Sequence, residues 1–146
     1  MSIIDELRQL STYLNDLESE LSIFFTLSLD MLTITDSNGA FIKVNPAWTT
    51  IMGYSPDEVV GRSCFNFIHN DDIALVKEVL VKLEDASIPK ILIRMRNKYG
   101  QYRLISWAAS KVFKGKIYSI GRDVTDVYAY QTKLEEEIKR LKEKCE

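Results

Sequence analysis

The chain has 146 residues, of which 46% are hydrophobic and 27% are charged, and its formal net charge is −2. This length fits one domain, and this composition is typical of a globular protein and excludes a generally disordered chain. A charge this close to zero creates no overall field for nucleic acid or an anionic membrane, so we expect neither as a partner.

The longest apolar run, residues 22–34, is too short to cross a bilayer and is interrupted by Asp30. The two cysteines, Cys64 and Cys145, lie far apart and have no metal-ligand spacing, which suits a reducing compartment better than a disulfide scaffold. We therefore predict a cytoplasmic location and no metal site.

An uninterrupted heptad pattern occupies the predicted N-terminal helix, residues 1–26. Its apolar residues follow alternating steps of four and three, which is typical of the a/d seam of a left-handed coiled coil. A helix that packs on its own domain usually has a wider apolar stripe, so we favour self-association. The seam consists of Ile3, Leu7, Leu10, Leu14, Leu17, Leu21 and Phe24.

The same spacing returns in the predicted C-terminal signalling helix, residues 124–146. Charged residues surround the seam, and many of them have the i,i+4 spacing that stabilises a helix surface. Gln131 at a seam position weakens the helix pair but helps to select its register. Together the two seams predict a homodimer. The second seam consists of Val124, Val127, Gln131, Leu134, Ile138, Leu141 and Cys145.

Between these helices, the spacing of apolar residues in 27–123 indicates a domain that contains both helices and strands. We expect two strands joined at Ser37-Asn38-Gly39, then three helices, then three strands joined by tight turns. Asn45 is expected to cap the first short helix, and Ser55 and Glu58 have the spacing of a capping box. This order predicts an α+β fold, with one antiparallel sheet and helices on one of its faces.

A series of short motifs lies between residues 27 and 126. The motifs are Asp36-Ser37-Asn38-Gly39, Val44-Asn45-Pro46-Ala47-Trp48, Met52-Gly53-Tyr54-Ser55, Glu58-Val59-Val60-Gly61-Arg62, Phe67-Ile68-His69-Asn70-Asp71-Asp72, Lys98-Tyr99-Gly100, Ser106-Trp107 and Gly121-Arg122-Asp123-Val124-Thr125-Asp126. Their order and spacing resemble the PAS superfamily. The resemblance implies a five-stranded antiparallel sheet, a small-molecule cavity in many members, and parallel dimers formed by the flanking helices. It also implies a downstream effector domain, such as a histidine kinase or a cyclic-dinucleotide enzyme, which this sequence does not encode.

The last motif bears most directly on function. Asp123-Val124-Thr125 is similar to the Asp-X-Thr motif from which the signalling helix of bacterial PAS sensors begins. Asp123 and Thr125 can bind backbone and side-chain groups where a strand meets a helix. We therefore expect both residues to relay a signal, although a plain helix cap would explain the same pair.

Gly61-Arg62-Ser63-Cys64 resembles the segment of light-oxygen-voltage photosensors whose cysteine bonds to flavin. A buried flavin ring needs amide hydrogen-bond partners, and the positions that would supply them hold Met95, Ile105 and Gly121. A flavin photoreceptor therefore stays only an alternative, and Cys64 is interpreted as a small buried hydrophobe. Residues 71–85 contain no histidine for a heme iron, and the single histidine, His69, is expected to be structural. No cofactor is predicted.

Apolar residues of the central strands and helices are candidates for a ligand pocket. The pattern fits either a filled core or a cavity for a small apolar ligand, and a protein-interaction module without a ligand is a further alternative. A Ser-His-Asp or Cys-His catalytic set needs a free histidine, and the single histidine is expected to be structural. Catalysis by this chain is therefore not expected. The pocket candidates are Met52, Phe65, Phe67, Val76, Leu80, Ile93, Met95 and Ile105.

Overall fold

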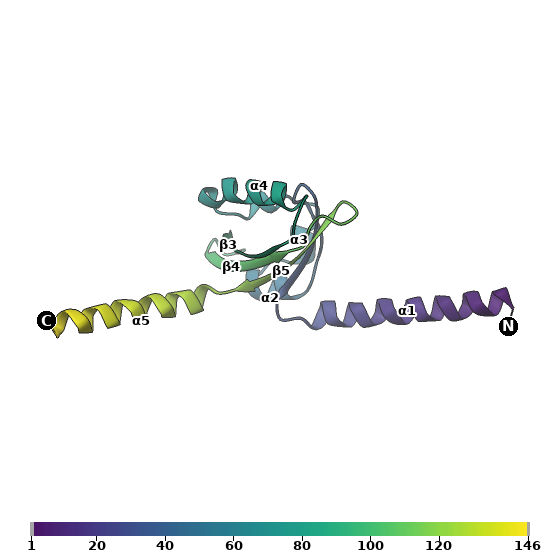
Figure 1. Cartoon of the computed structure of the whole chain (residues 1–146), viewed down its shortest axis with the longest axis horizontal. Coiled ribbons are helices and arrows are strands. Elements are labelled where there is room, and N and C mark those ends of the chain that lie inside the picture. Colours follow the sequence, from purple (N-terminus) through teal and green to yellow (C-terminus); the bar gives the residue numbers. More distant parts are fainter. Residues whose placement is uncertain (1, 146) are drawn as a thin grey trace.

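The computed structural model describes residues 2–145 as an antiparallel sheet with a long helix at each end of the chain (Figure 1). In chain order the elements are α1 (Ile3–Leu27), β1 (Met31–Asp36), β2 (Phe41–Val44), α2 (Ala47–Met52), α3 (Pro56–Val59), the 3-10 turns η1 (Cys64–Asn66) and η2 (Asn70–Asp72), α4 (Ile73–Lys82), β3 (Ile88–Arg96), β4 (Tyr102–Ala109), β5 (Lys116–Asp123) and α5 (Thr125–Lys144). The predicted α+β fold and its order of elements are confirmed.

The five strands have the spatial order β2-β1-β5-β4-β3, and every neighbouring pair is antiparallel. β1 and β5 are therefore adjacent in the middle of the sheet, although they are the first and last strands in sequence. Their register places Met31 opposite Gly121 and Asp36 opposite Lys116. The point where the chain enters the sheet from α1 thus lies beside the point where it leaves toward α5.

The short helices and α4 cover one face of the sheet, and the main core lies between these layers (Figure 1). Trp48, Met52 and Ile105 are completely buried there. The Trp48 indole donates a hydrogen bond of 2.8 Å to the Thr33 hydroxyl, so its one polar group is satisfied inside the core. The predicted capping box is present at α3, where the Glu58 carboxylate accepts from the Ser55 backbone N–H at 3.3 Å.

α1 and α5 extend from the domain in opposite directions along its long axis (Figure 1). Neither helix contains a buried residue. The seam leucines of α1 are 37% exposed at Leu17 and up to 67% exposed at Leu21, so neither helix packs its seam against its own domain. The predicted ranges of the N-terminal and C-terminal helices include Met1 and Glu146. These two residues lie outside the part of the chain that the structure describes. Among residues 2–145, no helix has both the length and the apolarity needed to cross a membrane.

The expected capping role of Asn45 is wrong. Pro46 occupies the N-cap position of α2, and no side chain caps that helix. The Asn45 side-chain amide instead bonds the backbone of three residues around the α1–β1 connection: Phe25 in α1, Asp30 in the linker and Leu32 in β1. These partners are described below, since they connect α1 to the domain.

Candidate signal junction and interior cavity

The junction between β5 and α5 is held by the side chains of Asp123 and Thr125. The Thr125 hydroxyl donates to the Asp123 carboxylate at 2.6 Å and accepts from the Leu104 backbone N–H at 2.7 Å. The Thr125 backbone N–H also donates to Asp123 at 2.9 Å. The first residue of α5 is therefore bonded to both β5 and β4, so a shift between these strands changes the geometry at the start of the helix.

Arg103 on β4 completes this junction. Its Nε donates to the Asp123 carboxylate at 2.7 Å, and both side chains are largely shielded from solvent. Partial burial raises the pKa of the Asp123 carboxyl, but hydrogen bonds from Thr125 and Arg103 outweigh that effect and leave the pKa below its ordinary value. Asp123 is thus a carboxylate at neutral pH and an acceptor for both partners.

Asn45 forms the matching connection on the side of α1. Its Oδ1 accepts from the Leu32 backbone N–H at 2.9 Å, while its Nδ2 donates to the carbonyl oxygens of Asp30 at 2.9 Å and Phe25 at 3.1 Å. Asn45 is completely buried, so these bonds have no competition from water. One side chain therefore fastens the last turn of α1 and the following linker to the sheet.

A salt bridge joins this linker to β5. The Asp30 carboxylate accepts from Nε of Arg122 at 3.1 Å and from Nη2 of Arg122 at 3.2 Å, which is a bidentate pair. Arg122 directly precedes Asp123 on β5. The contacts therefore run without a gap from the last turn of α1, through Asn45 and Asp30, to the residue before the α5 junction.

An interior cavity of about 90 Å³ lies between the sheet and α4. Four of the predicted pocket residues, Val76, Leu80, Ile93 and Met95, line it. The other four do not: Met52 and Ile105 are completely buried in the core, Phe67 is also buried, and Phe65 packs at the edge of the core. The remaining wall residues are Thr33, Thr35, Gly39, Phe41, Cys64, Ile68, Val79, Leu83, Ile91, Trp107, Ala109, Ile117 and Ser119.

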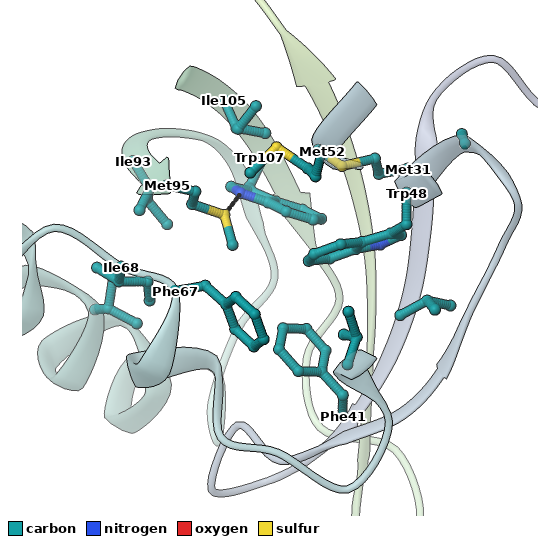
Figure 2. Packing of buried hydrophobic residues seen from close by; sticks show 14 residues of the cluster. Met31, Phe41, Trp48, Met52, Phe67, Ile68, Ile93, Met95, Ile105 and Trp107 are labelled. Carbon is teal, nitrogen blue, oxygen red and sulfur yellow. Dashed lines mark hydrogen bonds between the residues drawn. The ribbon is translucent and has the colours of Figure 1, made fainter. Parts of the chain in front are cut away.

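Trp107, which lines this cavity, packs against a second indole ring in the core. Figure 2 shows Trp107 beside Trp48, with a separation of 6.1 Å between the ring centroids. The Trp107 N–H points at the Met95 sulfur, at a distance of 3.3 Å. Gly121 leaves the space for this ring, since a Cβ atom there would lie 2.7 Å from two atoms of the indole. Large side chains thus fill most of the interior.

Cys64 lines the cavity beside the turn between β1 and β2. Burial raises the pKa of its thiol to about 11, so the reactive thiolate is scarce at neutral pH. A Cβ atom on Gly39 would lie 2.7 Å from the Cys64 sulfur, which shows how closely the turn packs on it. These features describe a cysteine that packs against the turn rather than an activated nucleophile.

The other polar residues considered in the sequence have structural partners. His69 caps η2, where its Nδ1 accepts from the Asp71 backbone N–H at 3.0 Å. Arg94 on β3 binds Asp72 at 2.7 Å, and Lys98 in the β3–β4 turn binds Glu58 at 2.8 Å, so both basic side chains have an acidic partner. Within residues 2–145, no group of three or more His, Cys, Asp or Glu side chains is placed to hold a metal ion.

Comparisons with known families agree with this architecture. The family model described as PAS fold matches residues 41–120, which is more than half of the chain. The chain therefore belongs to the PAS fold family, and it is a single domain of this sensory and signalling type. Among curated proteins, the basic helix-loop-helix ARNT-like protein 2 of Mus musculus is 40% identical over 43 residues, which are 30% of this chain and 7% of that protein. The chain spans less than a tenth of the length of this curated relative.

Solved structures share the fold at low sequence identity. A domain of a sensory box sensor histidine kinase/response regulator from Geobacter sulfurreducens is 22% identical, with a TM-score of 0.67 over 75% of this chain and 96% of that one. An RNA-binding light-oxygen-voltage receptor is 20% identical, with a TM-score of 0.72 over 84% of this chain and 37% of that one. At these identities the similarity establishes the fold and not a shared ligand or partner.

Proposed function

We propose that this PAS domain forms a parallel homodimer through α1 and α5 and passes a signal to an effector domain, such as a histidine kinase, beyond α5. The observation that carries the proposal is the junction at Thr125, where the first residue of the exit helix is bonded to two strands of the sheet. A coupling free energy of about 1–3 kcal/mol between the domain and the helix would suffice for regulation.

The exposed seams support the homodimer. A helix with unpaired leucines at successive a and d positions leaves apolar surface in water that a second copy can bury. In a parallel pair, the g positions Glu6, Tyr13 and Glu20 lie beside the e positions Ser11, Glu18 and Phe25 of the other helix. None of these pairs brings two like charges together, so the parallel arrangement has no electrostatic penalty at its flanks.

Two kinds of input fit this geometry. A mechanical input from α1 can reach β5 through Asn45 and through the salt bridge between Asp30 and Arg122. A ligand input can enter through the cavity, because Trp107 lines it on β4 and packs on Gly121 of β5. The cavity volume of about 90 Å³ suits an apolar molecule of a few non-hydrogen atoms, since pockets for larger organic ligands are about 300–1,000 Å³.

The size and chemistry of the interior also support the absence of a flavin or heme. Met95 occupies a position where flavin needs an amide, and its sulfur is engaged by the Trp107 N–H. The interaction module without a ligand remains the second candidate, because side chains fill most of the interior. Mass spectrometry of small molecules extracted from the purified protein separates the two: a stoichiometric apolar compound supports the ligand input, and its absence supports the interaction module.

A spin label on the native Cys145 tests the relay. Labelling at neutral pH selects Cys145, because it is exposed whereas Cys64 is partly buried with a raised pKa. In a dimer, pulsed electron paramagnetic resonance then measures the distance between the two α5 helices. We expect Thr125→Val to shift or broaden this distance, whereas Thr132→Val is the control, because the Thr132 hydroxyl bonds only its own helix at Tyr128.

The two possible failures have different meanings. If light scattering shows that the wild-type protein is a monomer at micromolar concentration, the dimeric relay is contradicted. If the protein is a dimer but Thr125→Val and Thr132→Val give the same distance distribution, the junction at Thr125 does not set the geometry of α5.

A further inference from the structure

The single histidine of the chain, His69, lies at the edge of β3 just before α4. Its backbone N–H donates to the Arg94 carbonyl oxygen at 2.9 Å, which fixes it to β3. Its side chain caps η2, because Nδ1 accepts a hydrogen bond of 3.0 Å from the backbone N–H of Asp71. Only a neutral imidazole with its proton on Nε2 has a free lone pair on Nδ1. The cap therefore depends on an unprotonated ring.

Protonation reverses the role of Nδ1. Both nitrogens of an imidazolium carry hydrogen, so Nδ1 stops accepting, and its new N–H faces the Asp71 N–H across 3.0 Å. The Asp71 carboxylate lies 3.9 Å from the same nitrogen, and it has no other ionic partner within residues 2–145. Asp71 thus offers its N–H to the neutral ring and its carboxylate to the charged ring.

The other groups around the ring come from η2, β3, β4 and α4. Asp72 in η2 is held by Arg94 on β3 through two hydrogen bonds of 2.7 Å and 3.1 Å, which compensate its charge. The Tyr102 ring on β4 packs on the imidazole with 4.7 Å between the centroids, and an aromatic face attracts a cation. The positive end of the α4 dipole opposes a proton at this point. Asp71 therefore carries the carboxylate that is free to pair with a protonated His69.

We propose that His69 is a pH-sensitive cap: the neutral ring holds the Asp71 N–H, and the protonated ring releases it and pairs with the Asp71 carboxylate. Histidine is the side chain that ordinarily changes charge between about pH 5 and pH 8, which suits it to this role. The cap is complete at the alkaline side of the transition and is lost as the pH falls, because the proton occupies the acceptor. The proposal does not rest on the homodimer or on the relay, and it adds proton uptake as an input to the domain.

The position of the cap connects it with the interior. η2 leads directly into α4, and the Ile73 N–H at the start of α4 bonds to the Asn70 carbonyl oxygen in η2. α4 forms one wall of the interior cavity through Val76, Val79 and Leu80. Release of the cap therefore loosens the first turn of the helix that covers the cavity.

His69→Asn is the matched variant, because an asparagine N-cap accepts the same bond and its amide takes up no proton. Water-exchange NMR on the full chain measures the protection of each backbone N–H relative to an unfolded chain at the same pH. Between about pH 7.5 and pH 5.5 we expect the protection of the Asp71 N–H to fall at least about fivefold in the wild-type protein and less than about twofold in His69→Asn. The Ile73 N–H should show the same difference.

Two further measurements test the chemistry of the exchange. Nitrogen chemical shifts of the imidazole identify its tautomer, and at neutral pH we expect the proton on Nε2. This measurement uses the wild-type protein, so it stands even if a variant fails to fold. Asp71→Asn keeps the backbone N–H but removes the carboxylate that attracts the proton. The N–H at position 71 should then be released at a lower pH than in the wild-type protein.

The proposal is overturned if the neutral ring carries its proton on Nδ1, or if the protection of the Asp71 N–H falls equally in the wild-type protein and in His69→Asn. Release of the N–H at an unchanged pH in Asp71→Asn would overturn the pairing with the carboxylate. A fall in protection that is confined to Asp71 and absent at Ile73 would overturn the effect on α4. None of these results bears on the dimer, which light scattering tests separately.

Discussion

Replacing Asn45 with alanine should release α1 from the domain and lower the free energy of unfolding by about 3 kcal/mol. The substitution removes the three hydrogen bonds that the buried amide forms with Phe25, Asp30 and Leu32. A hydrogen bond contributes about 1 kcal/mol net, and backbone groups left without a partner in a buried site add to the loss. The bonds to α1 and its linker are lost in the same step, so stability and attachment should fall together.

Urea denaturation measures the first effect, and hydrogen exchange at the backbone N–H of Ser28, which bonds to the last turn of α1, measures the second. Asn38→Ala is the matched control, because Asn38 is an exposed asparagine in the β1–β2 turn and should change stability by less than about 0.5 kcal/mol. A loss below about 1 kcal/mol for Asn45→Ala, with unchanged exchange at Ser28, would refute the assignment of Asn45 as the attachment point.

Two further changes probe the sheet. Gly121→Ala should cost about 1–3 kcal/mol in urea unfolding, because the new Cβ would lie 2.7 Å from the buried Trp107 ring; a cost near zero would show that the indole moves freely. Asp123→Asn should reduce the loss of stability between pH 7 and pH 3. The pKa of Asp123 is lower in the folded chain than in the unfolded chain, so its contribution is complete above about pH 4 and is lost as the pH falls through the folded-state pKa. An acid-induced loss as large as that of the wild-type protein would contradict this role.

The features that local patterns determine could be predicted from the sequence. The heptad steps predicted α1 and α5 to within a few residues, because a helix forms from residues three and four apart. The succession of strands and helices along the chain and the capping box at Ser55 were also predicted, because turns, period-two strands and caps each depend on a few neighbouring residues. Asp123 and Thr125 are two residues apart, so their contact required no knowledge of the fold.

The contacts between distant residues depended on the tertiary structure. Asn45 looks like a helix cap in the sequence, but its amide faces the α1–β1 linker, which the fold places beside it. Asp30 and Arg122 are 92 positions apart, and only the adjacency of β1 and β5 brings them together.

The interior shows the same division between sequence and structure. The apolar alternation of the strands predicted a core, but it could not tell a filled core from a cavity, because the free volume depends on how large rings pack. A cavity of about 90 Å³ remains beside Trp107, and the close approach of Trp107 to Gly121 joins two strands of the sheet at one point. The sequence by itself therefore determined the helices, the strands and the contact between Asp123 and Thr125. The tertiary structure decided which of these elements contact each other. Such contacts join residues that are distant in the sequence, and only the folded sheet brings them together.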